Sequence, residues 1–533
     1  MSDVGQLLRT RAVEFPDRPF CYVGGAGFTF AEMDQRTDAL AAGLAARGVK
    51  RSDRVALLMS NRIEFVESYF ALAKLGAIQV PLNAFLKGDF LLHQLADSRS
   101  SFLITDGPGC AAVQPLMTAL PELQLVASVD LTDEAGDLDG DVIPFSTLHA
   151  WGRRPPEVDV SADDAMSILY TSGTTGYPKG CVLSHGFYAR VGELGTRALD
   201  LTEADALFSA LPMFHLSGGI FMIMPALVNG IAAHFEPTFS ARAFLTNAAK
   251  AKATVGMAVG AMCHALLATP VGPADTDHTI RTMMVAPLGP ADQQRFKDRF
   301  GIDPWTEVYG QTECMPVTVN PVSGARDRSG CGFAAPDLEV ELLDENLEPV
   351  PDGEVGEICL RPKRRHAMFD GYWDNPAATV KSTVGLWYHT GDSARRLPSG
   401  QFTFVDRKAD VLRRKGENVS SLELEAAIRS LAKVAEVAVI AAPSETSEDE
   451  IAACIVVQPG ETITPEELFG QFRDTLPYFA VPRYVALLDR LPVNAMNRVL
   501  KHALKAQLDD ATLWDFSQLG FVIGAHERRG VSG

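Results

Sequence analysis

Short apolar runs alternate with helix-like segments between about residues 54 and 106, and no other feature constrains the fold as strongly. The runs VALLM, AIQVPL and SFLITD are separated by helical patterns such as EFVESYFALAKLG. This alternation is typical of a parallel sheet with crossover helices and predicts the α/β fold class. The same rhythm returns between Leu207 and Phe300, so we expect two wound sheets in one large N-terminal domain.

The pattern changes toward the C-terminal end of the chain. The alternating segments LEVELLD and GEICLRP, separated by a PDG turn, predict a small β-rich subdomain at about residues 332–405. Residues 422–431 then form an amphipathic helical pattern, which the strand-like runs VAEVAVIAA and IAACIVVQ follow. We therefore expect an N-terminal domain over residues 1–405 and a smaller α+β domain over residues 411–533.

The composition is that of a soluble globular protein, and the charge narrows the choice of partners. Of the 533 residues, 47% are hydrophobic and 22% are charged, which excludes a disordered or fibrous chain. The net charge of −19 makes binding to nucleic acid or to an anionic membrane unfavourable, so we expect neither partner. An anionic ligand would need a local binding site.

The sequence also bears on the compartment. The eight cysteines are scattered without ligand spacing, which indicates reduced thiols. The N-terminal stretch MSDVGQLLRTRAVEF carries charges where a signal peptide needs an apolar core, so we expect a cytoplasmic protein. The long uncharged stretch at residues 206–235 is interrupted by Pro212, His215, Pro225 and Asn229, and it predicts a buried interior element rather than a membrane span.

The stretch YTSGTTGYPKG at residues 170–180 carries the clearest chemical signal. It follows the apolar run MSIL, which indicates a loop that leaves a strand. Its glycines let the backbone turn and expose amide donors, its hydroxyls add hydrogen bonds, and its lysine adds a positive charge. These properties suit a phosphate-binding loop, although the spacing differs from that of a Walker loop. The residues that we expect to hold phosphate are Ser172, Gly173, Thr174, Thr175, Gly176 and Lys179.

This loop resembles the signature loop of the adenylate-forming superfamily, which includes acyl-CoA ligases, nonribosomal adenylation domains and luciferases. The resemblance continues in order along most of the chain. The further matching segments are LPMFHLSGG at 211–219, YGQTE at 309–313, GYWDNPAAT at 371–379, WYHTGD at 387–392 and DRKADVLRRKGENVSSLELE at 406–425. The resemblance implies a two-part fold whose C-terminal domain moves about a hinge at residues 406–410.

The resemblance also implies a nucleotide site built from several of these segments. Tyr309 would lie against adenine, Thr312 would meet the α-phosphate, and Glu313 would hold magnesium, since a carboxylate is a hard ligand for a hard cation. The other implied nucleotide-binding residues are Gly310, Asp392 at the ribose hydroxyls, and Arg407 near the ribose and phosphate.

A coenzyme A thioester is the product that the resemblance implies. Gly416 matches a glycine that lets the pantetheine arm pass close to the backbone. His215 would line the acyl pocket near the path of the thiol rather than act as a base, with a satisfied core histidine as the alternative. Phe479 and Arg483 could receive the adenine and phosphate of coenzyme A, or be a packed phenylalanine and a surface arginine.

The sequence of the implied acyl pocket does not identify the acyl group. Its walls are apolar or small, which favours a bulky apolar acid, but core packing would give the same composition. The implied pocket residues are Met213, Phe214, His215, Cys314 and Met315.

Arg498 stands where the family has its catalytic lysine. Family members carry a stretch resembling LPxTxxGKxxK, and this chain has LPVNAMNRVLK at residues 491–501. The planar fork of arginine differs from the compact ammonium that bridges the carboxylate and the α-phosphate. Loss of one such preorganised contact costs on the order of 10²- to 10³-fold in rate, so we expect weak or absent adenylation. The alternative is that arginine is tolerated or that Lys501 shifts into place.

The sequence departs from the family pattern at two further places. Ala409 occupies the hinge position where the family has Asp or Lys, which predicts altered kinetics of the domain motion but not its loss. Val285 and Ala286 replace the glycine-rich start of the adenine wall. Tight ATP binding is therefore less favoured than binding of an acyl-adenylate, which also gains from burial of its acyl group.

We therefore expect an enzyme that forms an acyl-CoA thioester from an acyl-adenylate and coenzyme A and releases AMP. Its ligands would be AMP or the acyl-adenylate, coenzyme A and a small acyl substrate, with magnesium and ATP if adenylation is retained. A separate enzyme could supply the adenylate. Three alternatives stay open: a complete ATP-dependent acyl-CoA ligase, an adenylation enzyme that loads a carrier protein, and a non-catalytic nucleotide-binding protein.

Overall fold

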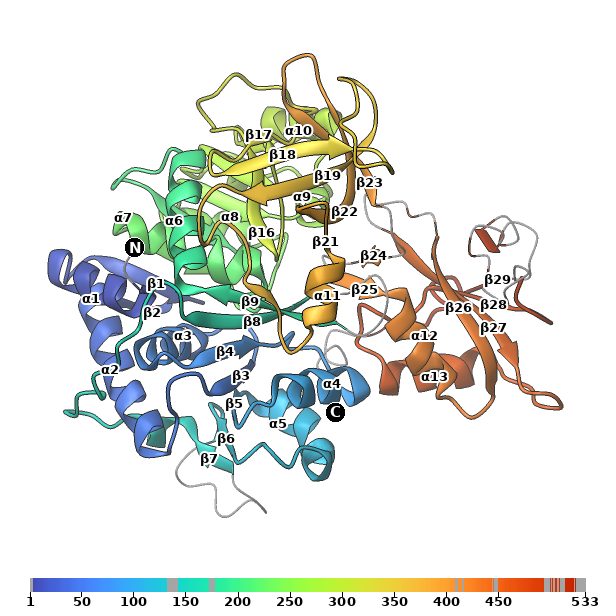
Figure 1. Cartoon of the computed structure of the whole chain (residues 1–533), viewed down its shortest axis with the longest axis horizontal. Coiled ribbons are helices and arrows are strands. Elements are labelled where there is room, and N and C mark those ends of the chain that lie inside the picture. Colours follow the sequence, from blue (N-terminus) through green and yellow to red (C-terminus); the bar gives the residue numbers. More distant parts are fainter. Residues whose placement is uncertain are drawn as a thin grey trace.

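Two large β-sheets with their helices form the N-terminal region in the computed structural model, and the C-terminal domain lies beside them (Figure 1). The α/β fold predicted from the sequence is confirmed. The structure describes residues 3–131, 142–171, 178–407, 411–414, 417–442, 444, 449–492, 499, 501, 504–505, 508, 513–521 and 523.

The first large sheet contains the alternating runs that dominate the sequence. Its strands are, in spatial order, β20 (Gly371–Tyr372), β9 (Lys179–Ser184), β8 (Ala165–Thr171), β4 (Ile78–Pro81), β3 (Arg54–Leu58), β5 (Phe102–Thr105), β6 (Leu125–Ser128) and β7 (Val142–Pro144). The strands from β8 to β7 pair in parallel, as the crossover helices require. β8 and β9 instead form an antiparallel pair that flanks residues 172–177.

The second large sheet is completed by the N-terminal end of the chain. Its strands are, in spatial order, β14 (Asp303–Trp305), β13 (Thr282–Val285), β12 (Val255–Ala258), β10 (Ala206–Ser209), β11 (Ala232–Phe235), β1 (Pro19–Val23) and β2 (Ala26–Thr29). β1 pairs in parallel with β11, and β2 pairs with β1 in the antiparallel direction. The two wound sheets expected from the sequence are therefore present, with a distant hairpin added to one of them.

The core joins the two sheets through helices that are buried on several sides. Every residue of α3 (Ile63–Leu75) from Phe65 to Leu75 is buried, so this helix lies in the interior rather than on the surface. It ends at Gly76, whose φ of 62° is a left-handed conformation that glycine adopts without strain. The other helices of this region are α1 (Val4–Glu14), α2 (Phe30–Ala46), α4 (Gly88–Ser98), α5 (Gly107–Val113), α6 (His185–Ala198), α7 (Ile223–Asn229), α8 (Phe244–Lys250), α9 (Gly260–Leu267), α10 (Pro290–Phe300) and α11 (Pro376–Lys381).

The uncharged stretch at residues 206–235 is an interior element, as the sequence predicts. It forms β10, a π-helical turn at Leu216–Ile220, α7 and β11, and most of its apolar side chains are buried. Among the described residues, no helix is long and apolar enough to cross a membrane. All eight cysteines are free thiols.

Two small sheets follow and carry the predicted nucleotide-binding residues Tyr309, Gly310, Asp392 and Arg407. The first consists of β15 (Val308–Gln311), β16 (Cys314–Val319) and β17 (Phe333–Ala334). The second consists of β18 (Leu338–Leu343), β19 (Gly356–Pro362), β22 (Trp387–Arg396), β21 (Thr383–Val384) and β23 (Phe402–Arg407). The runs LEVELLD and GEICLRP form the antiparallel neighbours β18 and β19.

The C-terminal domain contains the helix and strands expected from its sequence. Its elements are β24 (Val411–Arg414), β25 (Glu417–Ser420), α12 (Ser421–Arg429), β26 (Val434–Ala442), β27 (Glu450–Val457), α13 (Pro465–Thr475), β28 (Tyr484–Leu487) and β29 (Leu513–Asp515). Leu86 and Phe90 share one apolar cluster with Leu476 and Phe479, so the domain packs on the N-terminal region through apolar contact. The predicted hinge begins at the end of β23, and residues 408–410 lie outside the described part of the chain.

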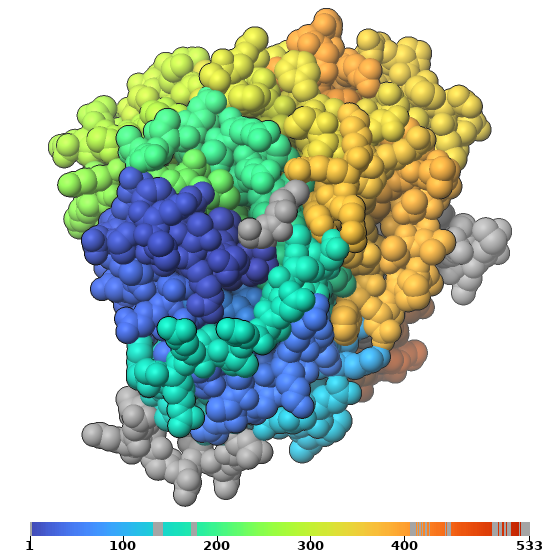
Figure 2. Space-filling model, turned by 60° about the vertical axis from the view of Figure 1, so that its left-hand side comes forward, coloured from blue at the N-terminus to red at the C-terminus, as the bar shows by residue number. Residues whose placement is uncertain are grey.

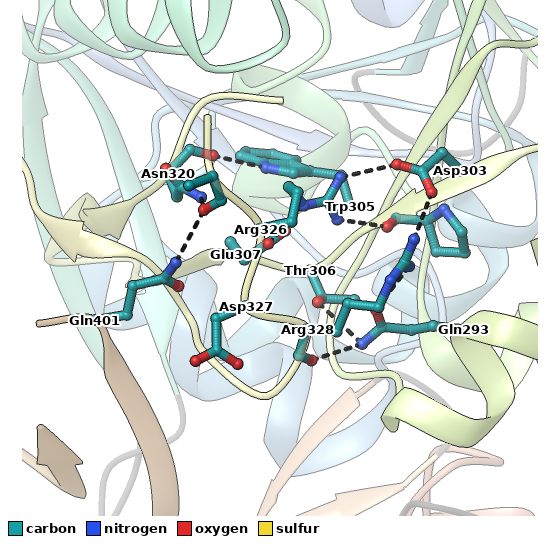
Figure 3. A network of polar contacts seen from close by, with 12 residues as sticks. Gln293, Asp303, Trp305, Thr306, Glu307, Asn320, Arg326, Asp327, Arg328 and Gln401 are labelled. Carbon is teal, nitrogen blue, oxygen red and sulfur yellow. Dashed lines mark hydrogen bonds and ion pairs between the residues drawn. The ribbon is translucent and has the colours of Figure 1, made fainter. Parts of the chain in front are cut away.

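A partly buried polar network fixes the approach to β15 (Figure 3). Arg326 and Arg328 donate to the two carboxylate oxygens of Asp303 over 2.9 and 2.8 Å, and Arg326 also donates to Glu307 over 2.5 Å. Burial raises the pKa of Glu307 although Arg326 opposes the shift. Since Tyr309 follows Glu307 by two residues, the network holds the strand that carries it. The other labelled members are Gln293, Trp305, Thr306, Asn320, Asp327 and Gln401.

The chain that leads into β8 ties the first sheet to the β-rich region. Figure 2 shows this chain, in teal, packed beside the N-terminal elements, in blue. Asp164 forms an ion pair with Arg51 over 2.6 Å, and Asp163 forms one with Arg365 over 3.0 Å. The start of β8 is therefore anchored on two sides.

Candidate functional site

Tyr309 and Asp392 meet at one corner of the site, although they lie 83 residues apart in the sequence. The Tyr309 hydroxyl donates to Oδ2 of Asp392 over 2.7 Å, and the Gln311 amide donates to the same oxygen over 2.6 Å. Asp392 is buried, so its carboxylate lies inside the site rather than in bulk solvent. The arrangement suits a carboxylate that accepts from ribose hydroxyls beside an aromatic ring.

The turn before Asp392 is held in place by Glu357. One Glu357 oxygen accepts from the Gly391 amide over 3.0 Å, and the other pairs with His389 over 3.1 Å. The φ of 73° at Gly391 is left-handed, which explains a glycine there. The Asp392 backbone amide donates to the Thr390 hydroxyl over 3.1 Å. Asp392 is thus presented by a turn whose backbone is fixed.

Two neighbours of this corner were not singled out from the sequence. Gln311 lies two residues after Tyr309 on β15, and that period of two along a strand was the signal that could have revealed it. The Phe404 ring lies 6.2 Å from that of Tyr309 and is half-exposed. Arg407 pairs with Asp392 in the β22–β23 register, which places its backbone beside the predicted ribose site.

Glu313, Tyr372 and Lys179 form a second corner. The Tyr372 hydroxyl donates to Oε1 of Glu313 over 2.8 Å, and the Lys179 ammonium lies 4.9 Å from the centre of the Tyr372 ring. The pKa of Tyr372 is raised, mainly by burial and secondly by the charge of Glu313. The hydroxyl therefore keeps its proton and donates. Glu313 is 8% exposed, and its carboxylate is a hard oxygen ligand of the kind that suits magnesium shared with substrate phosphates.

Of the remaining predicted nucleotide-binding residues, Thr312 and Gly310 are described by the structure and the loop residues are not. Thr312 lies in the turn between β15 and β16, between the two corners. Gly310 is closely packed, because a Cβ there would approach Sδ of Met315 to 2.4 Å. The predicted loop residues Ser172, Gly173, Thr174, Thr175 and Gly176 lie outside the described residues.

The predicted acyl-pocket residues gather at the end of β10 and along β16. Met213, Phe214, Cys314 and Met315 are all buried in the main apolar cluster. Phe214 contacts the rings of His215 and Phe85, with centroids 4.7 and 6.5 Å away. Phe85 in turn contacts Tyr478 of the C-terminal domain over 4.9 Å. A line of rings therefore joins the predicted pocket to the domain interface.

Arg190 supports the backbone of β16, which carries the predicted pocket residues Cys314 and Met315. Its side chain is fully buried and pairs with both Asp337 oxygens over 2.7 and 2.8 Å. It also donates to the carbonyls of Met315 and Pro316 over 2.7 and 3.1 Å. Sequence reasoning missed this residue, because an arginine in a helical pattern is ordinarily a solvated charge.

Replacement of Arg190 by lysine is expected to lower the free energy of unfolding by about 1–2 kcal/mol, because an ammonium has no planar fork for Asp337 and two carbonyls. Urea unfolding measures the change. Arg197→Lys, an exposed change on the same helix, is the matched control. Equal unfolding curves for the two variants would show that the fork contributes nothing.

The same pair makes a pH-dependent contribution to stability. Burial alone would raise the pKa of Asp337, but Arg190 and Arg364 outweigh it and hold the pKa below its usual value. A carboxyl with a depressed pKa stabilises the folded state above about pH 4 and loses that contribution as the pH falls through its folded pKa. Arg190→Lys is expected to make this acid-side loss shallower.

His215 is bound by the C-terminal domain. Its Nε2 lies 2.7 Å from Oε2 of Glu417, whose side chain is 6% exposed, whereas that of His215 is 38% exposed. Glu417 opens β25, directly after the predicted pantetheine glycine Gly416, which lies outside the described residues. The structure therefore brings Glu417 of the GENV segment to His215, a predicted pocket residue.

The two predicted coenzyme A residues lie on the C-terminal domain near this interface. The Phe479 ring is buried and lies 5.7 Å from that of Tyr478. Arg483 forms ion pairs with Asp515 over 3.1 Å and with Glu450 over 3.9 Å. Their assignment to coenzyme A stays a prediction.

Arg498, at the position of the catalytic lysine, and Ala409, at the hinge, lie outside the described residues. Lys501 is described, and its ammonium lies 2.7 Å from the Ser421 hydroxyl and 2.9 Å from Glu425. Both partners belong to α12 of its own domain. In this arrangement Lys501 is engaged within the C-terminal domain.

Comparison with known sequences identifies the relatives of the chain. A family model described as AMP-binding enzyme matches residues 8–373, and one described as AMP-binding enzyme C-terminal domain matches residues 423–497. Crotonobetaine/carnitine–CoA ligase of Salmonella paratyphi A is 32% identical over 487 residues, which cover 90% of this chain and 93% of the relative. The ligase of the same name from Citrobacter koseri is 31% identical over 485 residues, with the same coverage.

Solved structures with the same fold include two that are named for CoA or ATP chemistry. A double mutant of o-succinylbenzoate CoA synthetase (MenE) from Bacillus subtilis, bound with its product analogue OSB-NCoA, matches with a TM-score of 0.81 at 25% identity. The match covers 97% of this chain and 99% of that one. ATP-bound MatB from Rhodopseudomonas palustris matches with a TM-score of 0.68 at 26% identity, covering 96% and 99%.

Proposed function

This chain belongs to the adenylate-forming superfamily, in its acyl-CoA ligase branch, and from that premise we propose that it joins an acyl-adenylate to coenzyme A and releases AMP. We further propose that its own ATP-dependent adenylation is weak or absent. The proposal rests on Arg498 for the missing half-reaction and on one contact, His215 to Glu417, for the retained one.

The contact between His215 and Glu417 supports the retained half-reaction. In this family the C-terminal domain is expected to present its GENV side to the thiol after adenylation, and Glu417 of that segment contacts His215, which we assign to the acyl pocket. A buried carboxylate gains a charge-assisted hydrogen bond when it meets an imidazole N–H. The similarity to a MenE structure that holds an analogue of its CoA product is in keeping with this arrangement.

The chemistry asks little of the protein beyond positioning. The thiolate of coenzyme A attacks the carbonyl carbon of the mixed anhydride, a C–S bond forms, and the C–O bond to phosphate breaks. AMP leaves as a stable anion, so strong acid catalysis is unnecessary. Asp392 and Tyr309 would hold the nucleotide, while the pocket around Phe214 would orient the carbonyl. These residues carry the binding energy that makes the attack effectively intramolecular.

The adenylation half-reaction would need a catalytic lysine, which this chain replaces by arginine. Glu313 would hold a magnesium ion, which when bound neutralises charge on the phosphates of ATP. The carboxylate of the acid would still need a compact cation beside the α-phosphate, and the residue at that position is Arg498. Lys501 does not supply it in the described arrangement, because Ser421 and Glu425 hold its ammonium.

We also propose that the acyl group is bulky and apolar. Met213, Phe214, Cys314 and Met315 are buried together, and none of these side chains carries a charge. A pocket of this character binds by burial of apolar surface. The acyl group therefore contributes to retention of an adenylate that arrives from solution or from a separate enzyme.

Parallel assays test the proposal. Synthetic decanoyl-AMP and benzoyl-AMP are each mixed with coenzyme A, and the matched free acids are mixed with ATP, magnesium and coenzyme A. We expect thioester from at least one adenylate, and formation at least about tenfold slower from the matching acid, because one preorganised contact is missing. Equal rates from the acid and the adenylate would establish a complete ATP-dependent ligase instead.

The same assay separates the other two candidates. A carrier-loading enzyme would acylate a phosphopantetheinyl protein and leave free coenzyme A unused. A non-catalytic nucleotide-binding protein would bind AMP but give no thioester above the uncatalysed background. Either outcome would contradict the proposed function.

A further inference from the structure

We propose that α4 is the positioning element of the phosphate-binding loop, with His93 and Asp97 as its positioning residues. The inference rests on the proposed function, because that function assigns nucleotide binding to the segment between β8 and β9. α4 lies at the side of the N-terminal region that faces the C-terminal domain (Figure 1). One helix thus touches both flanks of the loop and the moving domain.

The first contact fixes the strand that enters the loop. The Tyr170 hydroxyl, near the end of β8, donates to Oδ2 of Asp97 over 2.6 Å. The pKa of Tyr170 is raised, mainly by burial and secondly by the hydrogen bond to Asp97. The hydroxyl therefore keeps its proton and remains a donor. A half-buried carboxylate that accepts from a half-buried phenol forms a strong, directional hydrogen bond.

The second contact fixes the strand that leaves the loop. Nε2 of His93 lies 3.2 Å from the carbonyl of Pro178, the residue before β9, and donates to it. The His93 ring also meets the Tyr170 ring edge-on at 6.4 Å. His93 and Asp97 are four residues apart and lie on one face of the helix. A single helix face therefore holds Tyr170 on one side of the loop and Pro178 on the other.

A third contact extends the support to the magnesium side of the site. The Trp373 indole donates to the carbonyl of Asp97 over 3.1 Å, and its backbone amide donates to the carbonyl of Gly180 over 2.7 Å. The preceding residue, Tyr372, donates to Glu313. The end of α4 is thus tied to the strand that carries Lys179 and to the predicted metal ligand.

The other end of α4 is held by the C-terminal domain. The Lys87 ammonium donates to the carbonyl of Arg473 over 2.6 Å, and burial lowers the pKa of Lys87. Gly88 has a φ of 55°, a left-handed conformation that glycine adopts without strain, and it lies beside the Thr475 carbonyl. With both ends anchored, α4 can hold the loop flanks within the small tolerance that phosphate binding requires.

Calorimetric titration of the full-length protein with AMP tests the proposal. Asp97→Ala and Tyr170→Phe each remove the same hydrogen bond, and each is expected to raise the Kd for AMP on the order of 10-fold. The double variant is expected to bind no more weakly than the single ones, because both changes delete one interaction. Asp97→Asn keeps an acceptor and is expected to recover part of the affinity. His93→Gln, which keeps an N–H donor, is expected to bind better than His93→Leu.

A matched control and a second readout exclude a merely structural effect. Asp89→Ala removes an exposed carboxylate from the same helix and is expected to leave AMP binding unchanged. In thioester assays with benzoyl-AMP, Asp97→Ala and Tyr170→Phe are expected to raise KM for the adenylate while KM for coenzyme A stays the same. Should Asp97→Ala lower the urea midpoint, the mild Tyr170→Phe variant decides.

Two results would overturn the inference, and they differ from failure of the proposed function. Kd values for Tyr170→Phe and Asp97→Ala within about twofold of that for Asp89→Ala would show that α4 does not position the loop. An equal rise in KM for both substrates would point to general loosening instead. If the unmodified protein bound no AMP and formed no thioester, the proposed function would fail before any variant was compared, and the inference would fall with it.

Discussion

Arg498→Lys is expected to raise the rate of ATP-dependent pyrophosphate release by about 10²- to 10³-fold, the largest change we predict. Lysine restores a slender ammonium that can bridge the acid carboxylate and the α-phosphate, whereas the guanidinium presents a planar fork. The measurement is pyrophosphate release from ATP and magnesium with decanoate or benzoate as the acid, at saturating concentrations of each.

The control for Arg498→Lys is the other half-reaction of the same variant. Thioester formation from decanoyl-AMP or benzoyl-AMP and coenzyme A does not use the bridging cation, so its rate is expected to stay within about twofold of that of the unmodified protein. Pyrophosphate release that does not rise would show that the guanidinium is not what limits adenylation, and the proposed division of labour would be wrong.

Glu417→Gln is expected to slow thioester formation from an acyl-adenylate by roughly 10- to 100-fold. The change removes a charge-assisted hydrogen bond between the domains, and such bonds contribute about 1.5–3 kcal/mol. His215 is more than a third exposed, so solvent screening places the expected loss toward the lower end. Single-turnover mixing of benzoyl-AMP with coenzyme A measures the rate directly.

Two comparisons make the Glu417 result specific. Glu461→Gln removes an exposed carboxylate from the same domain and is expected to leave the rate unchanged. AMP affinity of Glu417→Gln is also expected to stay the same, because Asp392 and Tyr309 lie on other elements. A rate equal to that of Glu461→Gln would mean that the contact with His215 does not hold the reactive arrangement.

The elements of the fold were predictable from local pattern, but several strand pairings were not. Alternating runs predicted β3, β4 and β5 and the helices between them, because each crossover unit is encoded in contiguous sequence. The pairing of β1 with β11 joins segments about 200 residues apart, and neither run carries a signal for its partner. The antiparallel pair of β8 and β9 was hidden by the glycine-rich loop between them.

The residues of the site were predictable where a single motif contains them. The contacts between residues of different motifs were not predictable. The resemblance singled out Tyr309 and Asp392, and the structure joins them by a hydrogen bond. It did not single out Glu417 as the partner of His215, because that pair depends on how the two domains sit together. His93 and Asp97 lie in an ordinary amphipathic helix, where spacing of four gives a shared face but no target.

The line of rings from Tyr478 through Phe85 to Phe214 has a consequence for substrate choice. Aromatic rings in edge contact are hard to compress, so a group that forces Phe214 outward also presses on the face where the C-terminal domain must seat. An acyl group of the wrong size would then be rejected when the C-terminal domain closes over it. Selection would occur at the sulfur-accepting step and not only at entry.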